Sequence, residues 1–304
     1  MGAIEIDGAY WPLDSLRRRG LRVPSLHVKE LLLDWGANFA ALQDLARQIL
    51  TDAGLKELRF PQGLRHLELA IQYPNKVIAV GANYLSHLVE MGLPTGKWPL
   101  MPFFFVPPTT SMTGSGKFVL LPRDTKKLDW EIELAVVVGS RLSCVGREEA
   151  LSAIAGYSVA IDLSARDLAR PAQSPTLVDL ARAKGQDTMK PFGPHITPAA
   201  FISDPHNLRM RLAVNGQVRQ DGRTSDMMYR IDEQLSIISQ FVTLEPGDVV
   251  LTGTPAGSAT VRGDFLQAGD RIVAEIEGIG QLEVEVTDDR DPLWGAGRHF
   301  PVGS

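Results

Sequence analysis

The sequence predicts an α+β protein that is mainly β, divided into a small N-terminal α+β domain over residues 1–70 and a larger domain over residues 71–304. Two observations lead to this fold class. Apolar residues at helical spacing stand out before residue 70, whereas from Lys76 onward short β-branched apolar runs recur between glycines and prolines. A chain of 304 residues is also long enough for one large and one small domain.

The N-terminal domain is predicted to contain a hairpin followed by two helices. Alternation of apolar and polar residues over Ala3–Trp11 favours the hairpin. The segments Val28–Asp34 and Asn38–Leu50 carry apolar residues at the spacing of one helix face. The segment Arg59–Glu68, which includes a proline and a glycine, is interpreted as the linker to the larger domain.

The larger domain is predicted to consist mostly of short strands. The strand-length runs are Val77–Val80, Phe103–Val106, Phe118–Leu121, Ile132–Val138, Tyr157–Ile161, Leu208–Val214, Val249–Leu251, Arg271–Ile276 and Gln281–Val286. Asn215-Gly216 is a strong signal for a two-residue hairpin turn. Helical spacing is clear only in Arg147–Ile154, Leu177–Ala183 and Ile231–Val242.

Composition and charge exclude several classes of function. A formal net charge of -5 gives no basic surface for nucleic acid. The one cysteine, Cys144, rules out an intramolecular disulfide and a cysteine-rich zinc site. Because the N-terminus lacks the apolar core of a signal peptide and no run is long enough to span a membrane, we expect a soluble, cytoplasmic protein.

Two glutamates stand at the beginning of the most apolar predicted strand. Residues two apart on a strand share a face, so Glu131 and Glu133 point the same way, and the apolar continuation predicts burial on both faces. Neighbouring buried carboxylates repel each other and lose hydration, which a bound cation would relieve. A solvent-facing strand end is the alternative.

A third carboxylate, Asp162, ends another apolar strand and is followed by Arg166 and Asp167. If Asp162 joins the two glutamates, three carboxylates without cysteine or clustered histidine favour an oxygen-preferring ion. We expect Mg²⁺ or Mn²⁺, with Ca²⁺ as a further candidate. The spacing in the sequence does not by itself prove that the three side chains converge.

A histidine and a glutamate lie three residues apart in the predicted helical turn 86–91, which Gly92 would close. His87 and Glu90 would then share one helix face. A carboxylate beside an imidazole orients the ring, and such a pair can act as a general base toward water. A surface ion pair is the alternative.

Six segments, in this order, resemble blocks of the fumarylacetoacetate hydrolase superfamily. They are Gly81–Glu90, Trp130–Val137, Asp162–Asp167, Pro191–Pro194, Asn215–Gly222 and Leu251–Gly257. The resemblance spans roughly residues 76–288. It implies that residues 71–304 form the family's mixed β-roll catalytic domain, and that the protein is a homodimer.

The resemblance also implies roles for individual residues. Glu131, Glu133 and Asp162 match the family's metal carboxylates, and His87 with Glu90 matches a water-activating pair that belongs to a mobile lid in several members. The other implied residues are the catalytic Lys184, Thr188 four residues after it, and the substrate-binding Tyr84, Arg166 and Thr254. Ala169 departs from the glutamine that many members carry, which indicates a different substrate contact or a roomier pocket.

The implied activity is metal-dependent hydrolysis of a carbon–carbon bond in a 1,3-diketo acid, such as an acylpyruvate, during aromatic or sugar acid catabolism. The reaction would pass through a metal-stabilised enolate, and His87 with Glu90 would activate the water. Decarboxylation, hydration or tautomerisation of a related 2-keto acid uses the same metal site and is the first alternative. A non-catalytic binding protein that retains the fold is the alternative from another class.

Overall fold

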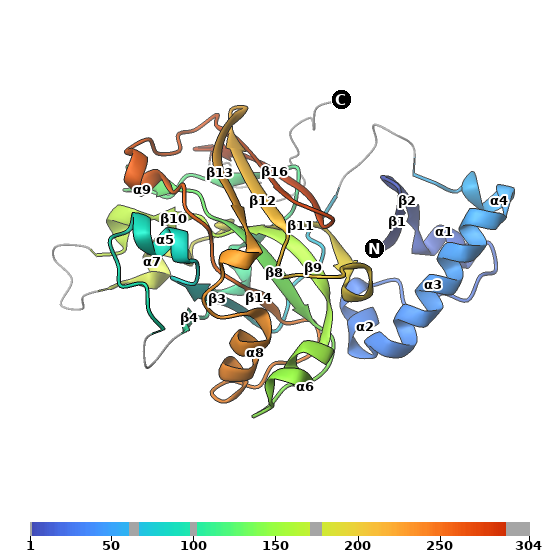
Figure 1. Ribbon diagram of the computed structural model, residues 1–304. Coiled ribbons are helices and arrows are strands. Elements are labelled where there is room, and N and C mark those ends of the chain that lie inside the picture. The colour runs from blue at the N-terminus through green and yellow to red at the C-terminus, as the bar shows by residue number, and fades with distance from the viewer. Residues whose placement is uncertain (1, 61–66, 98–101, 171–177, 290–304) are drawn as a thin grey trace.

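The computed structural model describes residues 2–60, 67–97, 102–170 and 178–289. Its N-terminal part begins with an antiparallel hairpin whose turn is Asp7-Gly8, where both residues have positive φ. The elements of this part are β1 (Ala3–Ile6), β2 (Ala9–Pro12), α1 (Leu13–Arg18), α2 (Val28–Leu33), α3 (Trp35–Thr51) and α4 (Ala53–Lys56). Helices α1 to α4 follow the hairpin (Figure 1).

The hairpin and helices of this part share a hydrophobic cluster of their own. Its buried members are Trp11, Leu13, Leu16, Leu31, Ile49 and Leu55. The predicted hairpin and both predicted helices are confirmed. The helices α1 and α4 are additions, since six and four residues are too few for a periodic pattern. The predicted linker runs into residues 61–66, which lie outside the described residues, and the boundary at residue 70 stays a prediction.

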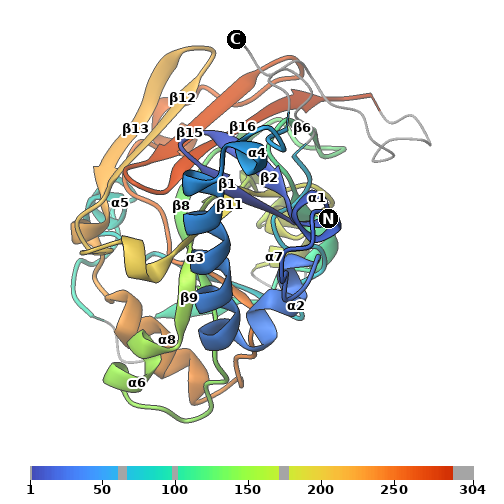
Figure 2. The same ribbon diagram turned by 90° about the vertical axis from the view of Figure 1, so that its right-hand side faces the viewer.

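Two mixed sheets form most of the larger part, and the fold is α+β and mainly β, as predicted (Figures 1 and 2). The seven-stranded sheet contains, in spatial order, β4 (Phe103–Phe105), β3 (Val77–Gly81), β14 (Val249–Leu251), β8 (Ile132–Val138), β9 (Ile154–Ile161), β11 (Lys190–Pro198) and β5 (Met112–Thr113). The five-stranded sheet contains β13 (Gln217–Arg223), β12 (Arg209–Val214), β15 (Arg271–Ile276), β16 (Gly280–Thr287) and β6 (Lys117–Leu120). A short pair, β7 (Leu128–Asp129) with β10 (Ser164–Ala165), lies beside them.

Every strand predicted from an apolar run is present, and Asn215-Gly216 turns β12 into β13. The strand β11 escaped prediction because three prolines interrupt its nine residues. The larger part also holds the helices α5 (Leu85–Glu90), α6 (Arg147–Ser152), α7 (Leu180–Lys184), α8 (Ile231–Ser239) and α9 (Ala259–Arg262). The predicted helix over 147–154 was too long, since Ile154 already begins β9, and the start of the one predicted over 177–183 lies outside the described residues at 177.

The main core lies between the two sheets. Ile132, Leu134 and Val136 of β8 share one buried cluster with Leu212 of β12 and Val284 of β16. The opposite face of β8, with Ala135 and Val137, belongs to a second buried cluster. The strand is therefore apolar on both faces, as the sequence predicted. Within the described ranges, no helix combines the length and the hydrophobicity needed to cross a bilayer.

Candidate metal centre

Antiparallel pairing of β8 with β9 brings three carboxylates together. Glu133 is opposite Ala160, and the backbone N–H of Asp162 donates to the carbonyl of Glu131 at 2.8 Å. Asp162 is two residues beyond Ala160, so its side chain falls on the same face as Glu133 and Glu131. One oxygen from each of the three lies within 4.8 Å of the others, and all three residues are buried. The structure thus brings together the three carboxylates whose convergence the sequence spacing left open.

Lys184 and Arg166 offset part of this buried negative charge. The ammonium of Lys184, at the end of α7, lies 2.6 Å from Glu131 Oε2 and 2.6 Å from Asp162 Oδ2. Arg166 pairs with Glu131 and, at 2.9 Å, with Asp129 Oδ2. Burial raises the pKa of Glu131, but Arg166 and Lys184 outweigh this effect, so the pKa lies well below its usual range.

Glu133, by contrast, forms no ion pair among the described residues. A metal ion would supply the missing positive charge beside it. Within the described part of the chain, the Glu133 side chain accepts one hydrogen bond, from Gly253 N at 2.6 Å. Burial, then Asp162 and Glu131, hold the pKa of Glu133 well above its ordinary value. The Lys184 ammonium, which contacts both Glu131 and Asp162, lies at a position where carboxylate oxygens surround a positive charge. The residues therefore fit a divalent, oxygen-preferring cation.

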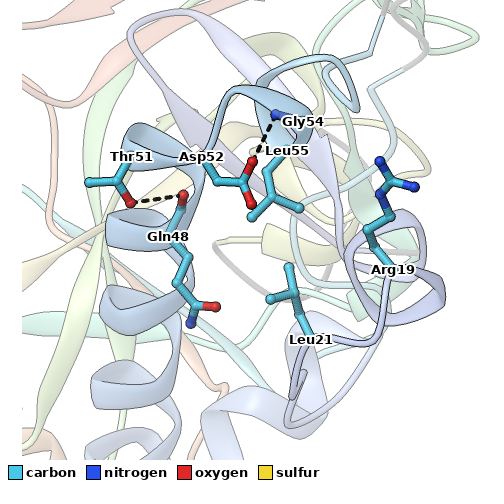
Figure 3. Close-up of a pocket in the computed structure, with 7 residues that line it drawn as sticks. All are labelled: Arg19, Leu21, Gln48, Thr51, Asp52, Gly54 and Leu55. Atoms are coloured by element: carbon cyan, nitrogen blue, oxygen red, sulfur yellow. Dashed lines mark hydrogen bonds between the residues drawn. The ribbon is translucent and has the colours of Figure 1, made fainter.

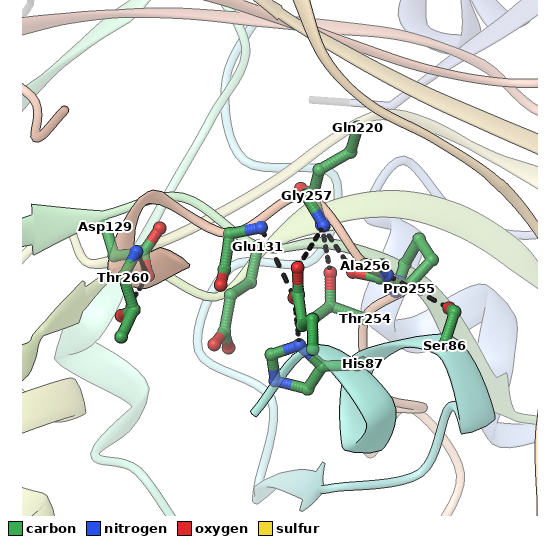
Figure 4. Close-up of polar contacts among 12 residues, drawn as sticks. Ser86, His87, Asp129, Glu131, Gln220, Thr254, Pro255, Ala256, Gly257 and Thr260 are labelled. Carbon is green, nitrogen blue, oxygen red and sulfur yellow. Dashed lines mark hydrogen bonds and ion pairs between the residues drawn. The ribbon is translucent and has the colours of Figure 1, made fainter. Parts of the chain in front are cut away.

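The histidine–glutamate pair lies on α5 next to the carboxylates. His87 Nδ1 is 2.6 Å from Glu90 Oε1, and His87 is one of the charges that lower the pKa of Glu131. Figure 4 shows the His87 ring and the Glu131 carboxylate directed toward the same space. Because Nδ1 is engaged by Glu90, Nε2 is the ring nitrogen left for chemistry. The surface ion-pair alternative does not apply, since His87 is 8% exposed.

A glycine-containing loop after β14 holds both groups in place. Gly253, at φ +94°, donates to Glu133, and a Cβ there would lie 2.9 Å from the Asn83 side chain. Gly257, at φ +109°, donates to Glu90 Oε2 at 2.8 Å, and a Cβ there would lie 2.3 Å from the carbonyl of Arg219. Only glycine fits either position. The loop thus ties the carboxylate cluster to the histidine pair.

The carboxylate of Glu90 makes the stability of this region pH-dependent. Burial raises the pKa of Glu90, but the hydrogen bonds from His87, Gly257 and Ser258 outweigh this effect and lower it below 4.5. A lowered folded-state pKa stabilises the fold above pH 4.5, and the contribution is lost as the pH falls through the folded value. We expect Glu90→Gln to destabilise the protein at pH 7 and by progressively less below pH 4.5, measured by urea unfolding. The exposed Glu148→Gln is the control, and a Glu90→Gln penalty that stays constant across this range would contradict the argument.

A buried glutamine fixes Thr254, the predicted substrate-binding threonine. Gln220 Nε2 donates to Thr254 Oγ1 and to the carbonyl of Pro255, each at 2.8 Å. Its Oε1 accepts from Ile132 N at 2.9 Å. Gln220 is 1% exposed, so water cannot replace these bonds. Its side chain therefore links the beginning of β8, between the two glutamates, to the loop after β14.

We expect Gln220→Ala to lower the free energy of unfolding by about 2–4 kcal/mol, because buried partners in β8 and in the loop are left unpaired. The matched control is Gln217→Ala, an exposed glutamine on the same strand, with an expected change within about 0.5 kcal/mol. Denaturant unfolding of both variants measures the difference. Equal stability of the two variants would show that the Gln220 network carries no net energy.

The other residues assigned by resemblance lie as follows. Tyr84 is fully buried, and its hydroxyl donates to Met210 Sδ at 3.2 Å. Arg166 is occupied by Asp129 and Glu131. Thr188 Oγ1 accepts from Leu120 N at 2.8 Å rather than reaching the carboxylates. Ala169 caps a short 3₁₀ turn over Arg166–Leu168. Substrate contact by Tyr84, Arg166 and Thr254 stays a prediction.

Three buried polar residues of the centre were not predicted. Asp129 accepts from Ala259 N at 2.6 Å and holds Arg166, and its alternation with Glu131 and Glu133 was a usable signal. Gln220 belongs to the segment Asn215–Gly222, but no signal in the sequence indicates its partners, which are distant along the chain. Lys190 gave none either: its Nζ lies 2.6 Å from Asp162 Oδ1, in a strand hidden by prolines.

Two cavities of the described residues lie away from the carboxylate centre. One of about 570 Å³ is in the N-terminal part (Figure 3), lined by Arg19, Leu21, Gln48, Thr51, Asp52, Gly54 and Leu55. Two of its polar side chains form hydrogen bonds with the nearby backbone. Thr51 Oγ1 donates to the carbonyl of Gln48, and Asp52 accepts from Gly54 N at 2.8 Å. Nothing there gathers charge as the carboxylate centre does.

Comparison with known proteins places these residues in a described family. Residues 76–287 match the model of the fumarylacetoacetate (FAA) hydrolase C-terminal family. The human mitochondrial oxaloacetate tautomerase FAHD2A is 39% identical over 213 residues, which are 69% of this chain and 65% of that protein. The chain therefore matches just under two thirds of the length of that relative. An uncharacterised protein of Pyrococcus abyssi is 43% identical over 70% of this chain and 90% of its own.

Solved structures give the same result. A fumarylpyruvate hydrolase from Pseudomonas aeruginosa in complex with Mn²⁺ and pyruvate is 31% identical, with a TM-score of 0.64 over 70% of this chain and 90% of its own. A maleylpyruvate hydrolase from Sphingobium sp. SYK-6 is 28% identical, with a TM-score of 0.73 over 94% of this chain and 95% of its own. The second likeness includes the N-terminal part.

Proposed function

The chain belongs to the fumarylacetoacetate hydrolase family, and on that premise we propose that it is a metal-dependent hydrolase that cleaves a carbon–carbon bond in a 1,3-diketo acid of the acylpyruvate type. The observation that carries the proposal is the pair of the buried His87 with Glu90 beside three converging carboxylates. Enzymes that only form an enolate have no need to activate water, whereas a hydrolase does. The Mn²⁺- and pyruvate-bound relative supports the same substrate class.

Glu131, Glu133 and Asp162 would hold the cation, with Mg²⁺ or Mn²⁺ as the expected ion. When bound, the ion supplies a Lewis acid that polarises the keto oxygens and stabilises negative charge on the enolate. Burial of the carboxylates keeps bulk water away and strengthens these electrostatic interactions.

His87 would act as the general base in this mechanism. Its Nε2 takes a proton from water, and the resulting hydroxide attacks the carbonyl carbon distal to the keto acid. The carbon–carbon bond breaks, its electron pair passes into the enolate of the 2-keto acid, and His87 returns the proton to carbon. Glu90, held by Gly257 N at 2.8 Å, keeps the imidazole oriented and stabilises it while it is charged.

Lys184 and Thr254 would complete the site. Lys184 lies 2.6 Å from Glu131 and from Asp162, so its ammonium is placed to meet negative charge on the substrate as well. Thr254 has a hydroxyl fixed by Gln220 at 2.8 Å, and it would donate to a substrate oxygen. The products are one carboxylic acid and one 2-keto acid.

Tautomerisation of oxaloacetate is the second candidate, and the identity of 39% to a protein named as an oxaloacetate tautomerase favours it. This reaction would use the same carboxylate centre but would need no activated water. His87 would carry a proton between carbon and oxygen instead of activating water, and the enolate would again be stabilised at the carboxylate centre.

Turnover of a small panel separates the candidates. The panel contains acetylpyruvate, fumarylpyruvate, oxaloacetate and a sugar-derived 2,4-diketo acid, each assayed with Mg²⁺, Mn²⁺ or EDTA. We expect a metal-dependent loss of diketo absorbance with two acid products. Interconversion of oxaloacetate tautomers without cleavage of any diketo acid would establish the tautomerase, and release of carbon dioxide alone a decarboxylase. Inactivity on all four compounds would contradict both candidates.

A further inference from the structure

A second lysine, Lys190, contacts the carboxylate centre and has no role in the proposed mechanism. It begins β11, whose residue Phe192 is opposite Ala160 of β9. Extending this register by two residues places Lys190 opposite Asp162. Its side chain is 1% exposed, and its ammonium lies 2.6 Å from Asp162 Oδ1. Burial lowers the pKa of Lys190, while Asp162 opposes that effect.

Each of the two lysines, Lys184 and Lys190, contacts one oxygen of the Asp162 carboxylate. Lys184 is 2.6 Å from Oδ2, whereas Lys190 is 2.6 Å from Oδ1. Lys190 is also held by the backbone, since its ammonium donates to the carbonyls of Lys184 and, at 3.3 Å, of Met189. Lys184 instead makes its contacts with the carboxylates on which a cation would be bound. The backbone therefore holds the Lys190 ammonium against Oδ1, whereas Lys184 is held at Oδ2 by carboxylates alone and is the lysine that an ion can displace.

The number of oxygens that Asp162 offers matters for the choice of ion. Ca²⁺ takes about six to eight oxygen ligands and often binds a carboxylate through both oxygens. Mg²⁺ requires about six ligands in a near-octahedral arrangement, which suits one oxygen from each carboxylate and several waters. A carboxylate restricted to one oxygen thus disfavours the larger ion.

We propose that Lys190 determines metal specificity: by occupying Asp162 Oδ1 it restricts this ligand to one oxygen and favours Mg²⁺ and Mn²⁺ over Ca²⁺. The inference rests on the metal centre of the proposed function and adds the choice of ion to it. Lys190 acts through Asp162 and does not itself touch the substrate.

The test is calorimetric titration of the EDTA-stripped protein with Mg²⁺, Mn²⁺ and Ca²⁺. Lys190→Met removes the ammonium and frees Oδ1. We expect this variant to favour Ca²⁺ over Mg²⁺ by about tenfold more than the wild type does, because Ca²⁺ gains a ligand. Lys190→Gln, which retains a donor for the backbone carbonyls, should show the same shift and replaces Lys190→Met if that variant does not fold.

Lys76→Met is the matched control. Lys76 Nζ lies 2.6 Å from the buried Asp248 Oδ2, so it is also a lysine on a buried aspartate, but it precedes β3 at the opposite end of that strand from the centre. Its Ca²⁺-to-Mg²⁺ preference should equal that of the wild type. An unchanged preference in Lys190→Gln would overturn the role of Lys190 and leave the metal centre standing. A wild type that binds none of the three ions would overturn both.

Discussion

Replacing His87 with alanine is expected to lower kcat by about 10²–10⁴-fold on whichever panel substrate the protein turns over, the range expected for a general base. The imidazole is 8% exposed, its Nδ1 is engaged by Glu90 at 2.6 Å, and no other imidazole of the described residues belongs to the centre. Metal affinity should be retained, because the three carboxylates are untouched. Steady-state kinetics with calorimetric metal titration measures both quantities.

His27→Ala is the control for this substitution, since His27 is an exposed histidine at the start of α2. Its kcat should equal that of the wild type. Glu90→Gln should give a smaller loss than His87→Ala, because the ring remains but is held less firmly. A His87→Ala enzyme with wild-type kcat would remove His87 from the mechanism.

Glu133→Gln is expected to have opposite effects on stability and on metal binding. In the metal-free protein Glu133 is a buried carboxylate without a cation, so replacing it with a neutral amide should raise the free energy of unfolding by about 1–3 kcal/mol. The amide oxygen can still accept from Gly253 N. Because a ligand is lost, the stabilisation that Mg²⁺ or Mn²⁺ gives the wild type should disappear, and turnover with it.

Thermal unfolding with EDTA and with Mg²⁺ separates these effects. Glu283→Gln serves as the contrast, since Glu283 is also a buried glutamate but is paired with Arg271 outside the centre. That variant should be less stable than the wild type in EDTA and keep the full response to Mg²⁺. A Glu133→Gln variant destabilised in EDTA would mean that Glu133 is already compensated without a metal.

Much of the seven-stranded sheet could be predicted, because its buried strands appear in the sequence as apolar runs. The run Ile132–Val138 is apolar on both faces, and Glu131 and Glu133 mark its polar end. Alternation then gives the face of each carboxylate, and the resemblance adds Asp162. Short helices such as α1 and the strand β11, with its three prolines, carry no comparable pattern.

What the sequence could not show is which groups meet across the fold. Gln220 meets Ile132 and Thr254 only because β13 packs near the beginning of β8, and a single glutamine has no periodicity to reveal this. Arg166 was assigned to the substrate by resemblance, yet its contacts are with Asp129 and Glu131. Lys190 reaches Asp162 through the register of a strand that the sequence does not reveal.

The most direct test of the central claim is exchange of the methyl protons of pyruvate in D₂O, followed by NMR. Both candidate reactions require an enolate stabilised at Glu131, Glu133 and Asp162, and pyruvate is the smallest 2-keto acid that can form one. We predict exchange that depends on Mg²⁺ or Mn²⁺, stops with EDTA and is absent in Glu133→Gln. Exchange at the buffer rate with the metal-loaded wild type, or exchange unaffected by EDTA, would contradict the proposal that this centre performs enolate chemistry.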